Sequence, residues 1–217
     1  MAEPIASADT RQRLLDAAGE VFAEQGFRAT TVRAICQRAR ANIAAVNYHF
    51  GDKERLYAAV LQYAHRCAMD TYPLEQGLPE AATAAQRLQA FIQSFLLRLF
   101  DEGSPAWHGK LMAREMIEPT HALDALVETE IRPRAEQLAA IVRALVGPQM
   151  SDEQVQMCAM SIVGQCLFYH HARPLIRRLN PAQRFTAREV ADLAAHITQF
   201  SLSALHHFAQ PEERARP

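Results

Sequence analysis

The heptapeptide N-Y-H-F-G-D-K gathers hydrogen-bonding and aromatic side chains in one short stretch that ends its helical pattern at Gly51. Its polar members are Asn47, Tyr48, His49 and Lys53. Catalytic sites, metal sites and helices that read nucleic acid all use such residues. The sequence on either side has to separate these three possibilities.

Two short helices joined by a tight turn are expected around this heptapeptide. Residues 30–50 have the size of a helix-turn-helix, with a start signal at Thr30 or Thr31 and a break at residues 40–42. The inward-facing positions are Ala34, Ile35, Ala39, Val46 and Phe50, and the outward-facing ones are Ala44, Ala45, Asn47 and Tyr48. Small residues at the start of the second helix allow close approach to the major groove, where Asn47 can pair with adenine through two hydrogen bonds.

The charge of this region supports contact with nucleic acid. The whole chain of 217 residues has a formal net charge of −1, so a surface for nucleic acid has to be local. Residues 28–55 carry six basic side chains against two acidic ones, a local excess of +4. The expected phosphate donors are Thr31, Tyr48, His49 and Lys53, together with the N-termini of the short helices.

The helical period continues through the rest of the chain, and this predicts an all-α fold. The expected amphipathic segments are residues 9–25, 88–99, 106–118, 122–146, 152–172 and 187–209. Gly26 is expected to stop the first, Pro133 to kink the fourth, and Pro174 and Pro181 to separate the last two. Pro73, Gly77 and Pro79 predict a domain boundary near residue 75.

Enzymatic and metal chemistry find little support in the sequence. It contains no phosphate-binding P-loop, no GxSxG and no GxGxxG following a strand, so we do not expect an enzyme. The pairs His170-His171 and His206-His207 point about 100° apart on a helix and do not converge on one ion. We therefore expect neither a metal nor another cofactor.

We expect a cytoplasmic protein with no membrane contact. The chain has no export signal and no apolar run of membrane-spanning length. Its four cysteines lack metal-ligand spacing, so reduced thiols are the default. A redox-responsive regulator stays an alternative, although Cys158 and Cys166 lie about two helical turns apart, too far for an unstrained bridge.

The segments G-F-R-A-T-T-V-R-A-I and N-Y-H-F-G-D-K-E-R-L-Y resemble the amino-terminal signature of the TetR family of transcriptional regulators. A third segment, L-M-A-R-E-M-I-E-P-T-H-A-L-D, is similar to the CecR-like subgroup. Many family members have an aromatic or Leu-Tyr pair where this chain has Val46-Asn47, so the base preference stays open.

The resemblance implies a three-helix helix-turn-helix domain at residues 1–55 and a helical ligand-binding and dimerisation domain at residues 56–217, with residues 56–72 as connecting helix. It also implies a dimeric repressor that binds a palindromic double-stranded DNA operator, with half-sites about 34–36 Å apart, and is released by a small apolar or amphipathic effector. A helical protein-interaction module is the other alternative.

The residues expected to carry these functions form three groups. The expected DNA-binding residues are Thr31, Arg33, Asn42, Ala44, Ala45, Asn47, Tyr48, His49 and Lys53. The expected effector-binding residues are Phe91, Phe95, Trp107, His108, Met112, Arg114, Glu115, Met116 and Phe168. The expected surface of the homodimer consists of Ile162, Cys166, Tyr169, Ile197, Phe200, Ala204, Leu205 and Phe208.

Overall fold

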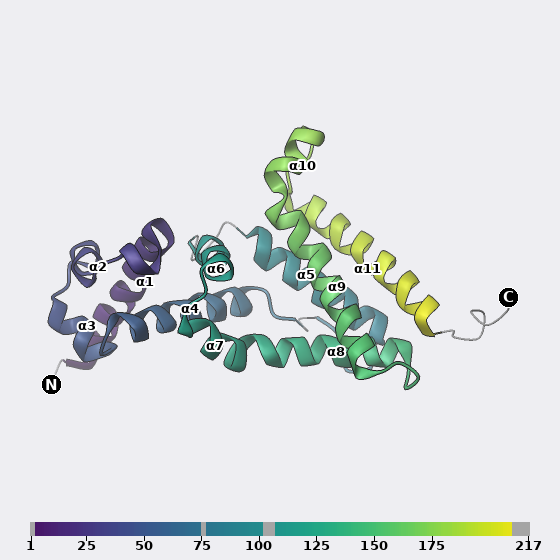
Figure 1. Ribbon diagram of the computed structural model, residues 1–217, viewed down its shortest axis with the longest axis horizontal. Helices are drawn as coiled ribbons and strands as arrows, with labels where there is room; N and C mark the ends of the chain where they lie inside the picture. The colour runs from purple at the N-terminus through teal and green to yellow at the C-terminus, as the bar shows by residue number, and fades with distance from the viewer. Residues whose placement is uncertain (1–2, 75–76, 102–106, 210–217) are drawn as a thin grey trace. The chain divides into compact units, whose positions relative to one another are not determined.

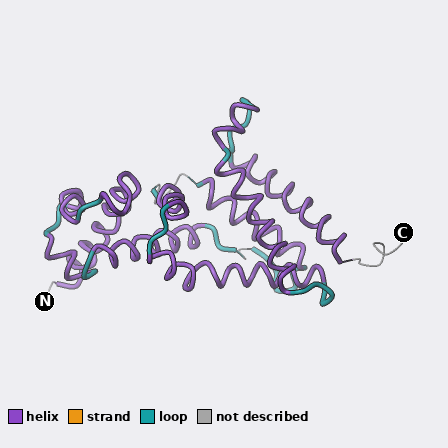
Figure 2. Tube along the Cα trace, viewed as in Figure 1, coloured by secondary structure: helices purple, strands orange, loops and turns teal. Residues whose placement is uncertain are grey.

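The computed structural model describes residues 3–74, 77–101 and 107–209, and over these residues every regular element is a helix (Figures 1 and 2). The helices are α1 (Glu3–Ala29), α2 (Val32–Ala39), α3 (Ile43–His49), α4 (Lys53–Thr71), α5 (Ala84–Phe100), α6 (His108–Ile117), α7 (His121–Leu126), the π-helical turn η1 (Val127–Ile131), α8 (Arg132–Val146), α9 (Asp152–His171), α10 (Arg173–Leu179) and α11 (Ala187–Ala209). The all-α prediction is confirmed over this part of the chain. None of these helices has the length and apolar character needed to cross a bilayer.

The chain packs as two compact units that do not follow chain order. The first unit comprises Met1–Asp70 and Glu102–Arg132, and the second comprises Thr71–Asp101 and Pro133–Pro217. Helix α6 therefore packs in the same unit as α1, although about 80 residues separate them. The division at residue 55 remains a prediction about function, separate from these packing units.

Local signals set the helices at the start of the first unit. Gly26 adopts a positive φ of 81°, which interrupts the helical backbone inside α1 as the sequence predicts. Thr31 caps α2 by accepting a hydrogen bond from the Ala34 N–H, and Asn42 caps α3 through the Ala44 N–H. Arg40 takes a left-handed conformation and makes the turn between α2 and α3.

The second unit is built around α5, α9 and α11, which pack side by side (Figure 1). A capping box starts α5 at Thr83 and Gln86, and another starts α9 at Ser151 and Gln154. The core of this unit includes Leu88, Ile92, Leu96, Leu138, Val142, Ile162, Cys166, Ile197 and Leu205. These residues recur at helical spacing because each of the helices buries one face.

The prolines at 133 and 174 both lie at the start of helices. Pro133 is the second residue of α8 and follows the wider η1 turn, which accommodates a residue that has no N–H to donate, and the kink expected there stays a prediction. Pro174 lies between α9 and α11, as expected. It occupies the first turn of α10, where a missing N–H costs nothing, so the separating segment contains a short helix that the sequence did not predict.

Candidate nucleic-acid interface

The second helix of the helix-turn-helix is fixed by a buried face. Val46 is fully buried and Phe50 nearly so, and both pack in the same core as Ile35 of α2. This core also contains Phe22 of α1 and Leu56 of α4. Because three helices hold the inward face of α3, its outward face has a defined orientation.

The outward face of α3 carries the side chains that can read a duplex. Tyr48 is 80% exposed, and Ala44 and Asn47 are also exposed. The ring of His49 is half-buried and contacts the Tyr48 ring edge to face, with centroids 4.9 Å apart. Ala45 departs from the expectation, since it is half-buried against the core.

The caps of the two short helices leave donors available. Thr31 and Asn42 are exposed, and each cap uses only the side-chain oxygen as an acceptor. The caps therefore do not use the hydroxyl proton of Thr31 or the amide protons of Asn42. Such donors at helix N-termini suit phosphate oxygens.

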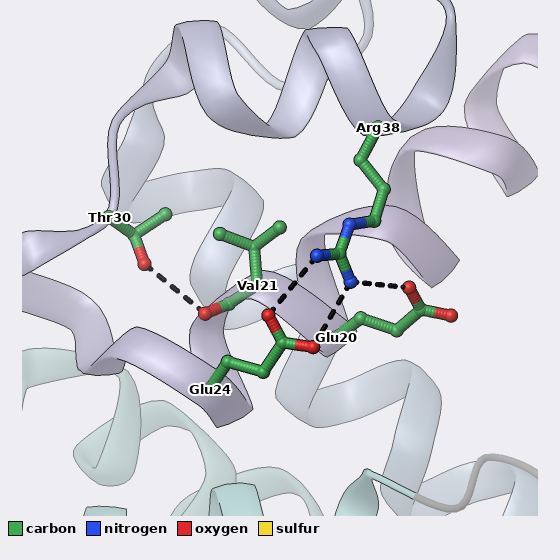
Figure 3. Close-up of polar contacts among 5 residues, drawn as sticks. All are labelled: Glu20, Val21, Glu24, Thr30 and Arg38. Carbon is green, nitrogen blue, oxygen red and sulfur yellow. Dashed lines mark hydrogen bonds and ion pairs between the residues drawn. The ribbon is translucent and has the colours of Figure 1, made fainter.

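Arg38, one of the six basic side chains of residues 28–55, forms ion pairs with two glutamates of the same chain. Arg38 donates from Nη1 to Glu20 at 2.9 Å and from both terminal nitrogens to Glu24 at 3.1 Å (Figure 3). The Glu24 and Glu20 carboxylates raise the pKa of Arg38. Both glutamates lie outside residues 28–55, so the basic surface is weaker than the local sequence count suggested. Arg28, Arg33 and Arg40 remain exposed on it.

Lys53 is engaged with the loop that precedes α2. Its ammonium donates to the carbonyl oxygens of Phe27 and Thr30, each at 3.0 Å, and lies 4.5 Å from the centre of the Phe27 ring. The Thr30 hydroxyl donates to the Gly26 carbonyl at 2.7 Å, and Figure 3 shows its longer contact with the Val21 carbonyl. Lys53 thus orders the start of the helix-turn-helix, and a phosphate contact from it stays a prediction.

Helix α6 is joined to the helices of this interface by polar side chains. Glu115 is fully buried, and its Oε2 accepts a hydrogen bond from the Tyr57 hydroxyl at 2.6 Å. Its Oε1 accepts from the N–H of Thr120 at 2.7 Å and from the Thr120 hydroxyl at 2.8 Å. Arg114 donates to the carbonyls of Ala23 and Glu24, at 3.1 and 3.0 Å. The sequence pointed to these two residues as effector contacts, but it gave no signal for Tyr57, which is 58 residues away.

The ring of Trp107 covers Gly19 of α1. A Cβ added at Gly19 would lie 2.2 Å from the indole ring, so only glycine permits this approach. Together with Arg114 and Glu115, this contact makes α6 part of the framework that holds α1 and α4.

The other expected effector residues fall in both units. In the first unit Met112 packs against the core, Met116 is exposed, and His108 contacts His65 with ring centroids 6.3 Å apart. In the second unit Phe91 is buried and stacks on half-buried Phe95 at 6.3 Å, while Phe168 is 56% exposed. Each unit therefore holds part of the expected set.

The expected dimer residues divide into a buried and an accessible group. Ile162, Cys166, Ile197 and Leu205 are buried in the core of the subunit itself, so they offer almost no surface to a partner. Phe200, Ala204 and Phe208 are exposed, and Tyr169 is half-buried. Apolar residues at helical spacing predict that one face of a helix is buried, but they do not show whether the same subunit or a second one buries it.

Burial makes three of the four thiols poorly suited to redox sensing. No cysteine forms a disulfide, and burial raises the pKa of Cys36 and Cys158 and raises that of Cys166 to about 12. A raised pKa lowers the fraction of reactive thiolate. Within the described part of the chain, no three His, Cys, Asp or Glu side chains come together as a metal site.

Two protein-family models match the chain. Residues 14–60 match the model for bacterial regulatory proteins of the tetR family. Residues 84–205, more than half of the chain, match the C-terminal domain of the HTH-type transcriptional dual regulator CecR. The first match contains the whole of α2 and α3.

Known proteins of similar sequence are regulators. The dual regulator CecR of Shigella flexneri is 28% identical over 179 residues, which cover 76% of this chain and 78% of CecR. The transcriptional repressor NicS of Pseudomonas putida is 23% identical, with 90% of this chain and 92% of NicS covered.

The fold recurs in solved structures. One is AibR in complex with isovaleryl coenzyme A and operator DNA, with a TM-score of 0.63 at 17% identity, covering 88% of this chain and 97% of AibR. The family matches, the all-helical fold and the exposed face of α3 agree with one another. The chain belongs to the TetR family of bacterial regulatory proteins, with a CecR-type C-terminal domain, and is a DNA-binding transcriptional regulator.

Proposed function

We propose that the protein is a repressor that binds a palindromic operator as a homodimer and leaves it when a small apolar or amphipathic effector binds. The observation that carries the DNA-binding part is the outward face of α3, whose polar and aromatic side chains are exposed while its other face is fully packed. The name of NicS as a repressor, and the AibR complex with an acyl coenzyme A and operator DNA, support the remaining parts.

Reading of the operator is assigned to two kinds of contact. Ala44 and the first turn of α3 allow close approach to the major groove, and Asn47 is placed on the face that can reach an adenine. Thr31, Arg33 and Tyr48 are exposed around it and suit phosphate contacts, which position the protein without reading sequence.

Selection of DNA fragments by the purified protein, followed by gel shifts at graded salt, tests this assignment. Asn47→Ala should relax the preference at particular base pairs by about 1–3 kcal/mol each. Tyr48→Phe should weaken binding to all sequences alike. An Asn47→Ala protein that loses affinity uniformly would show that Asn47 is not a base-reading residue, and selected fragments without a two-fold repeat would contradict the dimer.

The dimer surface is assigned to the exposed faces of α9 and α11. Met157, Met160 and Phe168 form an exposed apolar stripe on α9, and Phe200 and Phe208 are exposed on the neighbouring α11. Exposed apolar stripes on adjacent helices suit a four-helix bundle made with a second copy.

A small residue in the middle of α9 suits close packing against a symmetry copy of the same helix. Gly164, exposed in the middle of the stripe, has open space around the position of a Cβ and permits close approach of the second helix.

Gly164→Leu separates pairing from folding. A Cβ at this exposed position meets no atom within 4 Å, and leucine favours a helix over glycine, so we expect the folded monomer to be as stable as wild type or slightly more so. The side chain fills the closest approach of the two helices, so sedimentation should show a monomer. Gly164→Ala serves as the matched control and should weaken pairing less. A Gly164→Leu protein that stays a full dimer would remove this interface.

The coupling between effector and operator is assigned to α6. Its residues Arg114 and Glu115 hold α1 and α4, the helices that support the helix-turn-helix. Coupling requires a ligand that has different affinities for two positions of α6. Such a ligand would favour one position and so shift the orientation of α3. Loss of effector response with retained operator affinity in Tyr57→Phe is the expected result.

A further inference from the structure

Arg98 of α5 is a half-buried cation in the second unit that faces no carboxylate among the described residues. Its Nη1 donates to the carbonyl oxygen of Tyr72 at 3.0 Å and to the Ser94 hydroxyl oxygen at 2.6 Å. Its guanidinium carbon lies 5.7 Å from the centre of the Phe95 ring. Buried arginines normally pair with an acid, so this arrangement needs an explanation.

The two hydrogen bonds do not by themselves explain why an arginine occupies position 98. The Tyr72 carbonyl already accepts a hydrogen bond from the Ser94 hydroxyl at 2.6 Å, and so does not depend on Arg98. Both bonds use Nη1, which leaves the N–H groups of Nε and Nη2 without a partner in the described part of the chain. The unused edge of the guanidinium is the edge that binds carboxylates and phosphates in a fork.

A second cation contributes to the electrostatic surroundings of Arg98. Burial and the positive charge of Arg134 lower the pKa of Arg98 to about 10. Asp101 lies one turn further along the chain, but its carboxylate acts on Tyr72, where burial and this acid together raise the pKa of the hydroxyl. An anion beside the Arg98 guanidinium would favour its charged form.

Apolar side chains adjoin the guanidinium. Phe95, which lies against Arg98, stacks on Phe91 with ring centroids 6.3 Å apart, and half-buried Leu74 and Leu99 pack against the same core. An anion with an apolar body would find both of its parts matched here.

We propose that Ser94, Phe95 and Arg98, the Arg98 cluster, form a binding site for the anionic head group of an amphipathic small molecule. The head group is a carboxylate or a phosphate, and the apolar body lies along Phe95. The regulatory meaning of this site rests on the proposed function, whereas binding itself does not.

The test measures binding calorimetrically with the full-length protein in the absence of DNA. The probes are sodium octanoate and octyl phosphate, and 1-octanol is the uncharged control of equal chain length. The wild type should bind at least one of the two anions at least about 10-fold more tightly than octanol, as hydrogen bonds to charged groups imply. A preference for one anion identifies the head group. Equal binding of all three probes overturns the proposal.

The variant Arg98→Met removes the charge and keeps an apolar side chain of similar length. It should bind the anions at least about 10-fold more weakly than wild type and leave octanol binding unchanged. Arg188→Gln, an exposed arginine in the same unit, is the control and should bind as wild type does. Undiminished anion binding by Arg98→Met overturns the proposal.

The stability of the ligand-free variants separates a binding residue from a structural one. Arg98→Met should melt no lower than wild type, because it removes a half-buried charge that has no acid partner. A large loss of melting temperature would assign Arg98 to the fold instead. Arg98→Lys keeps the charge without the fork, and should keep a preference for anions over octanol with weaker binding.

A gel shift with operator DNA keeps this proposal distinct from the proposed function. If the anions bind at Arg98 but do not release the operator, the binding site is confirmed and its role as the effector site is excluded. A protein that binds no operator at all contradicts the proposed function, while the calorimetric result at Arg98 stands on its own.

Discussion

The two packing units treat a charge in a buried place in opposite ways. In the first unit, Glu115 has no exposed surface, and three donors from Tyr57 and Thr120 satisfy its two oxygens. In the second unit, half-buried Arg98 uses one nitrogen for two hydrogen bonds and faces no acid among the described residues. The first charge is satisfied by the fold and the second is not.

Apolar side chains on α9 and α11 and basic side chains of the first unit offer a second comparison. In the second unit Met157, Met160 and Phe200 present apolar surface on α9 and α11, as a region that binds partners does. In the first unit Arg38, Lys53 and Arg114 all have partners inside the unit. A surface that contacts DNA bases needs side chains held in fixed positions. A region that binds other molecules needs groups that have no partner within the subunit.

Glu115→Ala should have the largest effect on stability, because it leaves the buried Tyr57 hydroxyl and two donors of Thr120 without an acceptor. We expect a loss of about 3 kcal/mol in the free energy of unfolding, measured by urea denaturation. Glu118→Ala, which changes an exposed acid on the same helix, is the control and should change stability little. Equal losses of unfolding free energy in both variants would show that the three hydrogen bonds to Glu115 do not stabilise the fold.

His170, in the second unit, should make stability depend on pH. Burial, with the charges of Arg173 and His171, lowers its pKa to about 4, below the unfolded value of 6.5. The unfolded chain therefore binds more protons between these values, and stability should fall as the pH drops from 6.5 toward 4. We expect about 2 kcal/mol from this residue, after a discount for its contact with solvent.

The contribution of His170 is measured as a difference between variants. His170→Phe keeps a ring against Phe100 and should flatten the dependence of unfolding free energy on pH in that window. An unchanged slope in this variant would mean that other groups carry the pH dependence.

Lys53→Met should lower stability by about 1 kcal/mol, because the Phe27 and Thr30 carbonyls lose a charged donor. It should also weaken operator binding, since the loop before α2 is less ordered. Tyr48→Phe is the comparison, because its exposed hydroxyl has no part in packing. Its melting temperature should equal that of wild type while operator affinity falls. A Lys53→Met protein with normal stability would make Lys53 a phosphate contact alone.

Arg38→Gln should have the smallest effect on folding, since its ion pairs with Glu20 and Glu24 are exposed. It should nevertheless weaken operator binding measured by gel shift, because two carboxylates near the basic surface lose their counter-ion. Glu24→Gln should act in the opposite direction and strengthen binding. Changes of the same sign in both variants would rule out this electrostatic explanation.

The reading surface could be predicted because its determinants are local. The cap at Thr31, the burial of Val46 and Phe50 and the exposure of Asn47 and Tyr48 all follow from spacing along a few turns of helix. The same reasoning predicted the segments of α6, α9 and α11 to within about two residues.

Contacts between distant segments could not be predicted in this way. Nothing in the sequence pairs Tyr57 with Glu115, so the hydrogen bond between them could not be predicted, and an effector contact of Glu115 stays a prediction. Periodicity likewise marked Ile162 and Ile197 as buried, but could not show that their own subunit buries them. Helix α10 was missed because proline in a first helical turn looks the same as proline in a loop.

Trp107 is the single tryptophan of the chain, and its indole lies directly on Gly19 of α1. Tryptophan fluorescence of the unlabelled protein therefore reports only the contact of this indole with α1. A change of emission maximum while an effector is titrated would show that the indole leaves Gly19 in solution. The time course of that change would give the rate of this movement without an added dye.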